Sequence, residues 1–126
     1  DISCEVLPAE FTSLTTLEEF KFEYNLLVDL PDLTKMPKLK HLNVFGNQLG
    51  SSVTFLFQWM QLRALNLGGN ELLPCPAVEE MQWDSFEKLV IPGHWVFENQ
   101  NFVSELQEKF PKMKIAVDEN WNWEDL

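Results

Sequence analysis

Apolar residues recur along this chain at a nearly constant interval. Four stretches follow the pattern L-x-x-L-x-L-x-x-N-x-L: residues 17–27 (LEEFKFEYNLL), 39–49 (LKHLNVFGNQL), 62–72 (LRALNLGGNEL) and 86–96 (FEKLVIPGHWV). Phenylalanines replace leucines in the first stretch, and His94 replaces the asparagine in the fourth. The stretches start 22, 23 and 24 residues apart, and a fifth start fits at Phe110. A repeat of this period predicts a stack of similar structural units.

Each unit contains a short alternation of apolar and polar positions, as at Leu42 and Val44 or at Leu65 and Leu67. Such alternation predicts a strand with one buried face. A strand this short is not stable alone, so the strands must stack in parallel around a shared core. The opposite face of the resulting sheet is then open to solvent.

The pattern resembles that of the leucine-rich repeat family over roughly residues 7–118. The resemblance implies an α/β solenoid, with a short parallel sheet of about five strands on the concave face and irregular or short helical segments on the convex face. It also implies that Asn25, Asn47 and Asn70 bond the backbone of adjacent turns in a ladder, which His94 and Asp118 would interrupt. We expect one domain, 1–126, divided into a partial repeat or cap (1–16), four repeats (17–38, 39–61, 62–85, 86–109) and a terminal strand with a C-terminal cap (110–126).

One outer segment has a clear helical period. Between residues 101 and 110, Phe102, Val103, Leu106 and Phe110 recur at helical spacing. We therefore expect a short amphipathic helix on the convex side before the last strand.

The composition restricts the classes of partner that the chain is expected to bind. The 126 residues carry a net charge of −11, which argues against nucleic-acid binding and permits a basic partner. No apolar run is long enough for a membrane span. Cys4 and Cys75 lie three stacking steps apart, too far for a disulfide, so free thiols and a cytoplasmic location are expected. The chain begins with Asp, so an excised or processed piece of a longer protein is the alternative.

The repeat register predicts which side chains face outward from the concave sheet. Tyr24 beside Phe45 resembles the aromatic centre of a binding site with a polar rim, although isolated exposed aromatic residues are also common. The candidate protein-binding residues are Glu19, Lys21, Glu23, Tyr24, Lys40, His41, Asn43, Phe45, Arg63, Asn66 and Lys88.

Nothing in the sequence indicates catalysis. His41 is expected to form a salt bridge with Glu19 on the next strand, and His94 to have a structural hydrogen bond. No catalytic triad, phosphate loop or metal-ligand spacing is present, so we expect no enzyme activity, cofactor or metal.

The resemblance therefore favours a module that binds a protein or peptide on its concave sheet. Two alternatives are an acidic inhibitor of a basic protein and a structural segment of a longer array, which would self-associate through an open N-terminal edge. The acidic tail contains Trp121 and Trp123, which we expect to cover the exposed end of the hydrophobic stack. The alternative is a short motif that docks on a partner.

Overall fold

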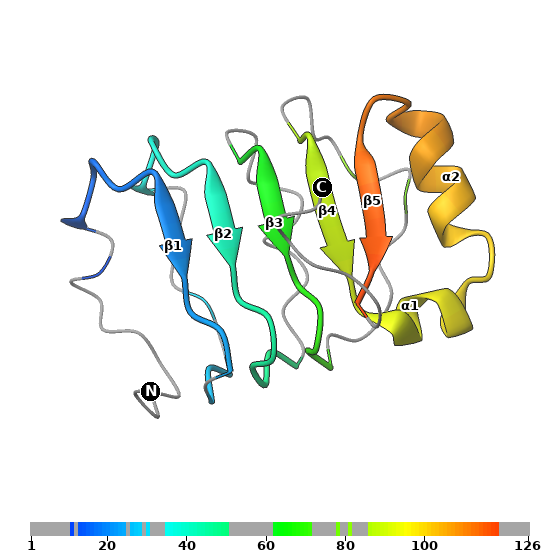
Figure 1. The fold of residues 1–126 in the computed structure, drawn as a ribbon, viewed down its shortest axis with the longest axis horizontal. Helices are drawn as coiled ribbons and strands as arrows, with labels where there is room; N and C mark the ends of the chain where they lie inside the picture. The colour runs from blue at the N-terminus through cyan, green and yellow to red at the C-terminus, as the bar shows by residue number, and fades with distance from the viewer. Residues whose placement is uncertain are drawn as a thin grey trace.

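The described residues form a parallel sheet with two helices at one end. A computed structural model describes residues 11, 13–24, 26–28, 30, 35–50, 62–71, 78, 81 and 86–118. Its five strands lie side by side in chain order (Figure 1). They are β1 (Glu19–Lys21), β2 (His41–Asn43), β3 (Ala64–Asn66), β4 (Lys88–Ile91) and β5 (Lys114–Val117). This arrangement is compatible with a leucine-rich-repeat-like α/β fold.

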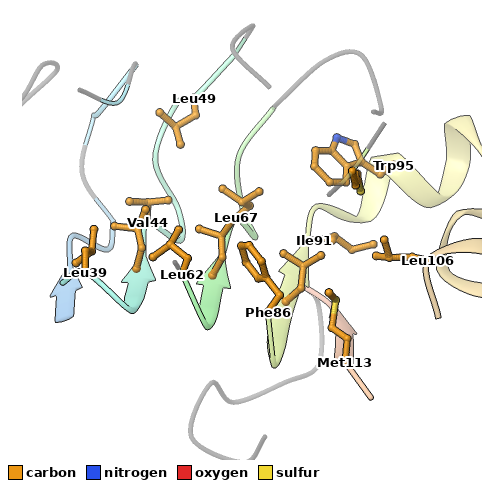
Figure 2. Packing of buried hydrophobic residues seen from close by; sticks show 14 of the residues in the cluster. Leu39, Val44, Leu49, Leu62, Leu67, Phe86, Ile91, Trp95, Leu106 and Met113 are labelled. Carbon is orange, nitrogen blue, oxygen red and sulfur yellow. The ribbon is translucent and has the colours of Figure 1, made fainter. Parts of the chain in front are cut away.

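The strand register places equivalent repeat positions opposite one another. Leu42 pairs with Leu65, and Leu65 pairs with Leu89, so the three leucines form one column. All three side chains are fully buried. Further apolar residues line the same side of the sheet, as Figure 2 shows for Leu39, Val44, Leu62, Leu67, Phe86, Ile91 and Met113. The predicted hydrophobic column is therefore confirmed.

Two helices fill the interval between β4 and β5. Helix α2 (Phe102–Lys109) buries Phe102 and Leu106, which confirms the predicted amphipathic helix. Helix α1 (Gly93–Glu98) begins directly after Pro92 and was not expected. It turns Trp95 into the core against Phe102, with ring centroids 5.5 Å apart. In Figure 1 both helices lie beyond β5, at the opposite end of the sheet from β1.

Buried asparagines join successive units. Asn47 accepts a hydrogen bond from Leu27 N–H at 3.1 Å and donates to Val44 O at 2.9 Å. Asn70 repeats the arrangement one unit later, accepting from Leu49 N–H and donating to Leu67 O, and it also donates to Val44 O of the preceding unit. Each amide thus satisfies backbone groups that the sheet leaves unpaired, because an amide both donates and accepts. The predicted ladder is confirmed at these two positions, and Asn25 lies outside the described residues.

The ladder ends where the sequence predicted. His94 is part of helix α1, so β4 is followed by a helix where β2 and β3 are followed by turns. Cys4, Cys75, Trp121 and Trp123 lie outside the described residues. Within the described parts of the chain, no helix is both long and apolar enough to span a membrane.

Candidate protein-binding surface

The candidate surface is the face of the sheet opposite the hydrophobic column, here called the outer face. It carries the strand side chains that alternate with Phe20, Leu42, Leu65, Leu89 and Ile115. The outer face is open at β1, where Glu19 and Lys21 are exposed, and at His41 in β2. It is closed further along the sheet, where Ala64, Asn66 and Val90 are buried.

Three equivalent repeat positions follow β1, β2 and β3 with the same unusual backbone. Tyr24, Gly46 and Gly69 each stand eighth in their repeat stretch, and their φ angles are +54°, +73° and +67°. The left-handed region is accessible to glycine but costs other residues roughly 1–2 kcal/mol. The second and third repeats meet this requirement with glycine. The first repeat places a tyrosine there, and Tyr24 is the one non-glycine residue with a positive φ among the described residues.

The strained backbone presents the Tyr24 ring to solvent while fixing its position. The side chain is 73% exposed, yet its ring lies 5.5 Å from Phe45, centroid to centroid, at an interplanar angle of 65°. Tyr24 N–H also donates to Phe45 O at 2.9 Å. A Cβ placed on Gly46 would lie 2.8 Å from Tyr24 Cδ1, so the ring rests directly against the glycine backbone.

Phe45 supports this tyrosine from a half-buried position. A Cβ on Gly68 would lie 2.7 Å from its ring, and one on Gly69 would lie 3.3 Å from it. The ring is therefore wedged between the Gly68–Gly69 turn and Tyr24. Sequence reasoning treated Tyr24 and Phe45 as equivalent exposed anchors, but only Tyr24 is largely exposed.

The charged side chains that were predicted to line this face differ in their exposure. Glu19 pairs with Lys21 along β1 at 3.6 Å, with both side chains about half exposed. The predicted Glu19–His41 salt bridge is wrong: the two residues are register partners, but the ion pair forms within β1. Glu23, His41 and Arg63 are exposed, whereas Lys40 and Lys88 are half-buried.

Asn43 and Asn66 were predicted to face solvent, but both are buried. They are 3% and 4% exposed, and each side-chain oxygen accepts a hydrogen bond from the backbone N–H two residues later, in Phe45 and Gly68. Asparagine commonly bonds its own backbone in this way at turns. Their side-chain amides therefore bond the backbone where β2 and β3 end. The outward register position of these residues did not predict this role.

Sequence reasoning also missed a contact that crosses strand β4. The carboxylate of Asp118, just after β5, accepts a hydrogen bond from Gly69 N–H, in the turn after β3, at 2.8 Å. Asp118 N–H donates to Ile91 O of β4. Only the repeat position of Asp118, where earlier units carry asparagine, signals a polar role for this residue.

The described residues also bear on the question of a metal site. Among the described residues, no group of three or more His, Cys, Asp or Glu side chains is placed to hold a metal ion. The exposed Tyr24 ring is of a residue type that is common at protein contact sites.

Part of the chain matches a known protein. The chain is similar to Toll-like receptor 10 of Bos taurus, with 36% identity over 67 residues. The matched region makes up 52% of this chain and 8% of that receptor, so the chain spans a small part of its relative. No family model matches the chain. The similarity agrees with leucine-rich repeats as the unit from which this sheet is built.

Proposed function

We propose that this protein is a short solenoid of leucine-rich repeats that binds a protein or peptide on the open part of its outer face. The contact centre is Tyr24, supported by Phe45 and flanked by Glu19, Lys21 and His41. No covalent chemistry is involved. The similarity to a receptor supports an interaction module in general, and the identity of the bound protein does not follow from it.

The observation that carries the proposal is the tyrosine in a glycine position. A side chain in the left-handed region is retained only when the surrounding structure holds it there, and such residues cluster at functional sites. Tyr24 is held by a backbone hydrogen bond, by the Phe45 ring and by Gly46, yet most of the side chain remains exposed. Tyrosine is also among the residues that dominate binding energy at protein contacts.

Charge on the outer face bears on the kind of partner. Five of the nine basic residues, Lys21, Lys40, Arg63, Lys88 and Lys114, lie in the outward positions of the strands or directly before them. The net charge of −11 is therefore not concentrated on this face. This distribution disfavours an acidic inhibitor that uses the outer face against a basic protein, and favours a contact of mixed charge.

The remaining expectations stay proposals. Strand β1 has a neighbour on one side only within the described residues, so self-association through that edge is a second hypothesis. A cytoplasmic location follows only from the two cysteines predicted to be free thiols.

Partner capture by the immobilised full chain tests the proposal. Proteins bound by the original chain are quantified against Tyr24→Ala, with Phe97→Ala as the matched control. Phe97 is 87% exposed but lies on α1, at the other end of the sheet from β1. We expect Tyr24→Ala to weaken a specific partner's affinity about tenfold or more, as loss of a contact hot spot does.

The control variant should retain full capture. Equal capture by both variants and the original chain would reject Tyr24 as the contact centre. Circular dichroism on each variant establishes that the fold is retained, and a purified partner then gives the dissociation constants by calorimetry.

A further inference from the structure

Strand β1 forms one edge of the described sheet. Within the described residues it pairs with β2 alone, whereas β2, β3 and β4 each have a neighbour on both sides. The N–H groups of Phe22 and Tyr24 and the carbonyl of Glu18 bond toward β2. Since the backbone groups of successive residues in a strand point to opposite sides, those of Glu19 and Lys21 point away from β2. Their direction suits the addition of another strand at this edge.

The apolar end of the stack is incompletely covered beside the same edge. Phe20 and Phe22 are half-buried, although the equivalent residues of the next repeat, Leu42 and Val44, are fully buried. Phe11 packs on Phe20, with ring centroids 4.5 Å apart, and still leaves it partly exposed. A strand added beside β1 would remove more of this apolar surface from water, which is favourable.

Glu19 and Lys21 give the edge a charge pattern that complements itself. Both side chains are about half exposed on the outer face. In an antiparallel pair of β1 strands with Phe20 opposite its own copy, Glu19 of each strand stands opposite Lys21 of the other. Opposite charges at directly paired positions stabilise a sheet. Glu19 and Lys21 are then also the residues that exchange backbone hydrogen bonds, as the direction of their backbone groups requires.

The two neighbouring registers are unfavourable. A two-fold axis at Glu19 would place this carboxylate opposite its own copy, and an axis at Lys21 would place two ammonium groups opposite each other. Like charges at directly paired positions destabilise a sheet, and charged residues on edge strands commonly prevent pairing for this reason. The alternating charges therefore favour the register centred on Phe20 over both of its neighbours.

We propose that two copies of this chain associate through β1, as antiparallel strands about a two-fold axis at Phe20. The two five-stranded sheets become one continuous sheet, with Phe20 and its copy side by side on the core side. A two-fold contact uses the same surface on both copies, so assembly stops at the dimer. The inference gives a register to the self-association hypothesis and does not depend on Tyr24.

Sedimentation equilibrium of the full chain over a concentration series tests the proposal. We expect the mass to rise from 14.7 kDa toward twice that value. Glu19→Lys and Lys21→Glu each place like charges opposite one another and should weaken the dimer about tenfold or more. Glu108→Lys is the matched control, because Glu108 is exposed on α2, at the other end of the sheet from β1. It should leave the dimer unchanged.

Recombining the charges isolates the contact between copies. An equimolar mixture of Glu19→Lys and Lys21→Glu chains restores opposite charges only across the two strands. The double variant Glu19→Lys/Lys21→Glu restores them within each strand as well. Both samples should regain the dimer of the original chain. Circular dichroism establishes that each variant is folded.

A mass of one chain at every concentration would overturn the proposal. Single variants that dimerise like the original chain, or a mixture that does not recover, would also overturn it, and growth beyond the dimer would refute the two-fold pairing. A dimer whose partner capture does not depend on Tyr24 rejects the proposed function alone. A monomer that captures its partner through Tyr24 rejects this inference alone.

Discussion

The carboxylate of Asp118 lies 2.8 Å from the amide nitrogen of Gly69, although the two residues are separated by 49 positions and by strand β4. The contact is available because β4 leaves the sheet into helix α1, where β2 and β3 are followed by turns. Asp118 N–H also donates to Ile91 O of β4. It joins the last strand to the middle of the sheet.

Removal of this carboxylate should weaken the C-terminal end of the fold. We expect Asp118→Ala to lower the free energy of unfolding by about 1 kcal/mol, since the hydrogen bond is charge-assisted but lies at an exposed site. Urea denaturation measures the effect. Asp118→Asn retains an acceptor oxygen and serves as the matched control, with a smaller expected loss. An alanine variant as stable as the original chain would show that the contact contributes nothing.

Gly68 should not tolerate a side chain. A Cβ there would lie 2.6 Å from Asp118 Cβ and 2.7 Å from the Phe45 ring. Gly68→Ala should therefore cost about 1–3 kcal/mol through overpacking. Gly50→Ala is the control, because its Cβ would meet only Gln48 O at 3.9 Å. The penalty should shrink in a Phe45→Ala background, and a penalty that is unchanged there would locate the strain elsewhere.

Substitutions at position 24 should affect the stability of the fold and the binding of the partner differently. Because its φ is +54°, Tyr24→Gly should be more stable than Tyr24→Ala by about 1 kcal/mol, the usual cost of a left-handed residue. Both variants should lose the partner equally. Thermal unfolding and the capture experiment measure the two properties separately. Equal stability of the two variants would mean that the backbone relaxes and that no strain is stored at this position.

The asparagine ladder should be intolerant of a carboxylate. The Asn70 amide accepts from Leu49 N–H and donates to Val44 O and Leu67 O. Asn70→Ala leaves these buried groups unsatisfied, at about 1–3 kcal/mol for each.

Asn70→Asp should be no better, because its carboxylate keeps the acceptor but faces two carbonyl oxygens without a proton to donate. Gln48→Ala, at an exposed site beside the ladder, should be nearly neutral in the same denaturation assay. An aspartate variant as stable as the original would contradict the proposed role of the amide donors.

The sequence predicted the sheet because its apolar positions recur at a nearly constant interval. The column of Leu42, Leu65 and Leu89 and the helix around Leu106 both follow from spacing alone. Helix α1 could not be predicted in this way, because the fourth stretch was aligned to a pattern that assigns a turn to Gly93 and His94. The alignment gave Val96 the buried position, and the helix gives it to Trp95 instead.

The surface was less predictable than the core. Alternation correctly indicated that Glu19, Lys21 and His41 face outward into solvent, but it could not distinguish an open outer face from a covered one. Asn66 and Val90 stand at outward positions and are nevertheless buried, which the alternation did not indicate. The aligned repeats showed that Tyr24 stands where the next two repeats carry glycine. Only the φ angle of the structure shows that this position has a left-handed backbone.

The hydrogen bond between Gly69 and Asp118 attaches the β5 end of the described sheet more firmly than the β1 end. Strand β1 pairs only with β2 in the described sheet. A pulling force therefore detaches it by breaking the hydrogen bonds of that one strand pairing. Strand β5 pairs with β4 and is also tethered to the turn after β3, so it must break both attachments before it detaches. Under load, the described sheet should therefore unravel from β1 toward β5.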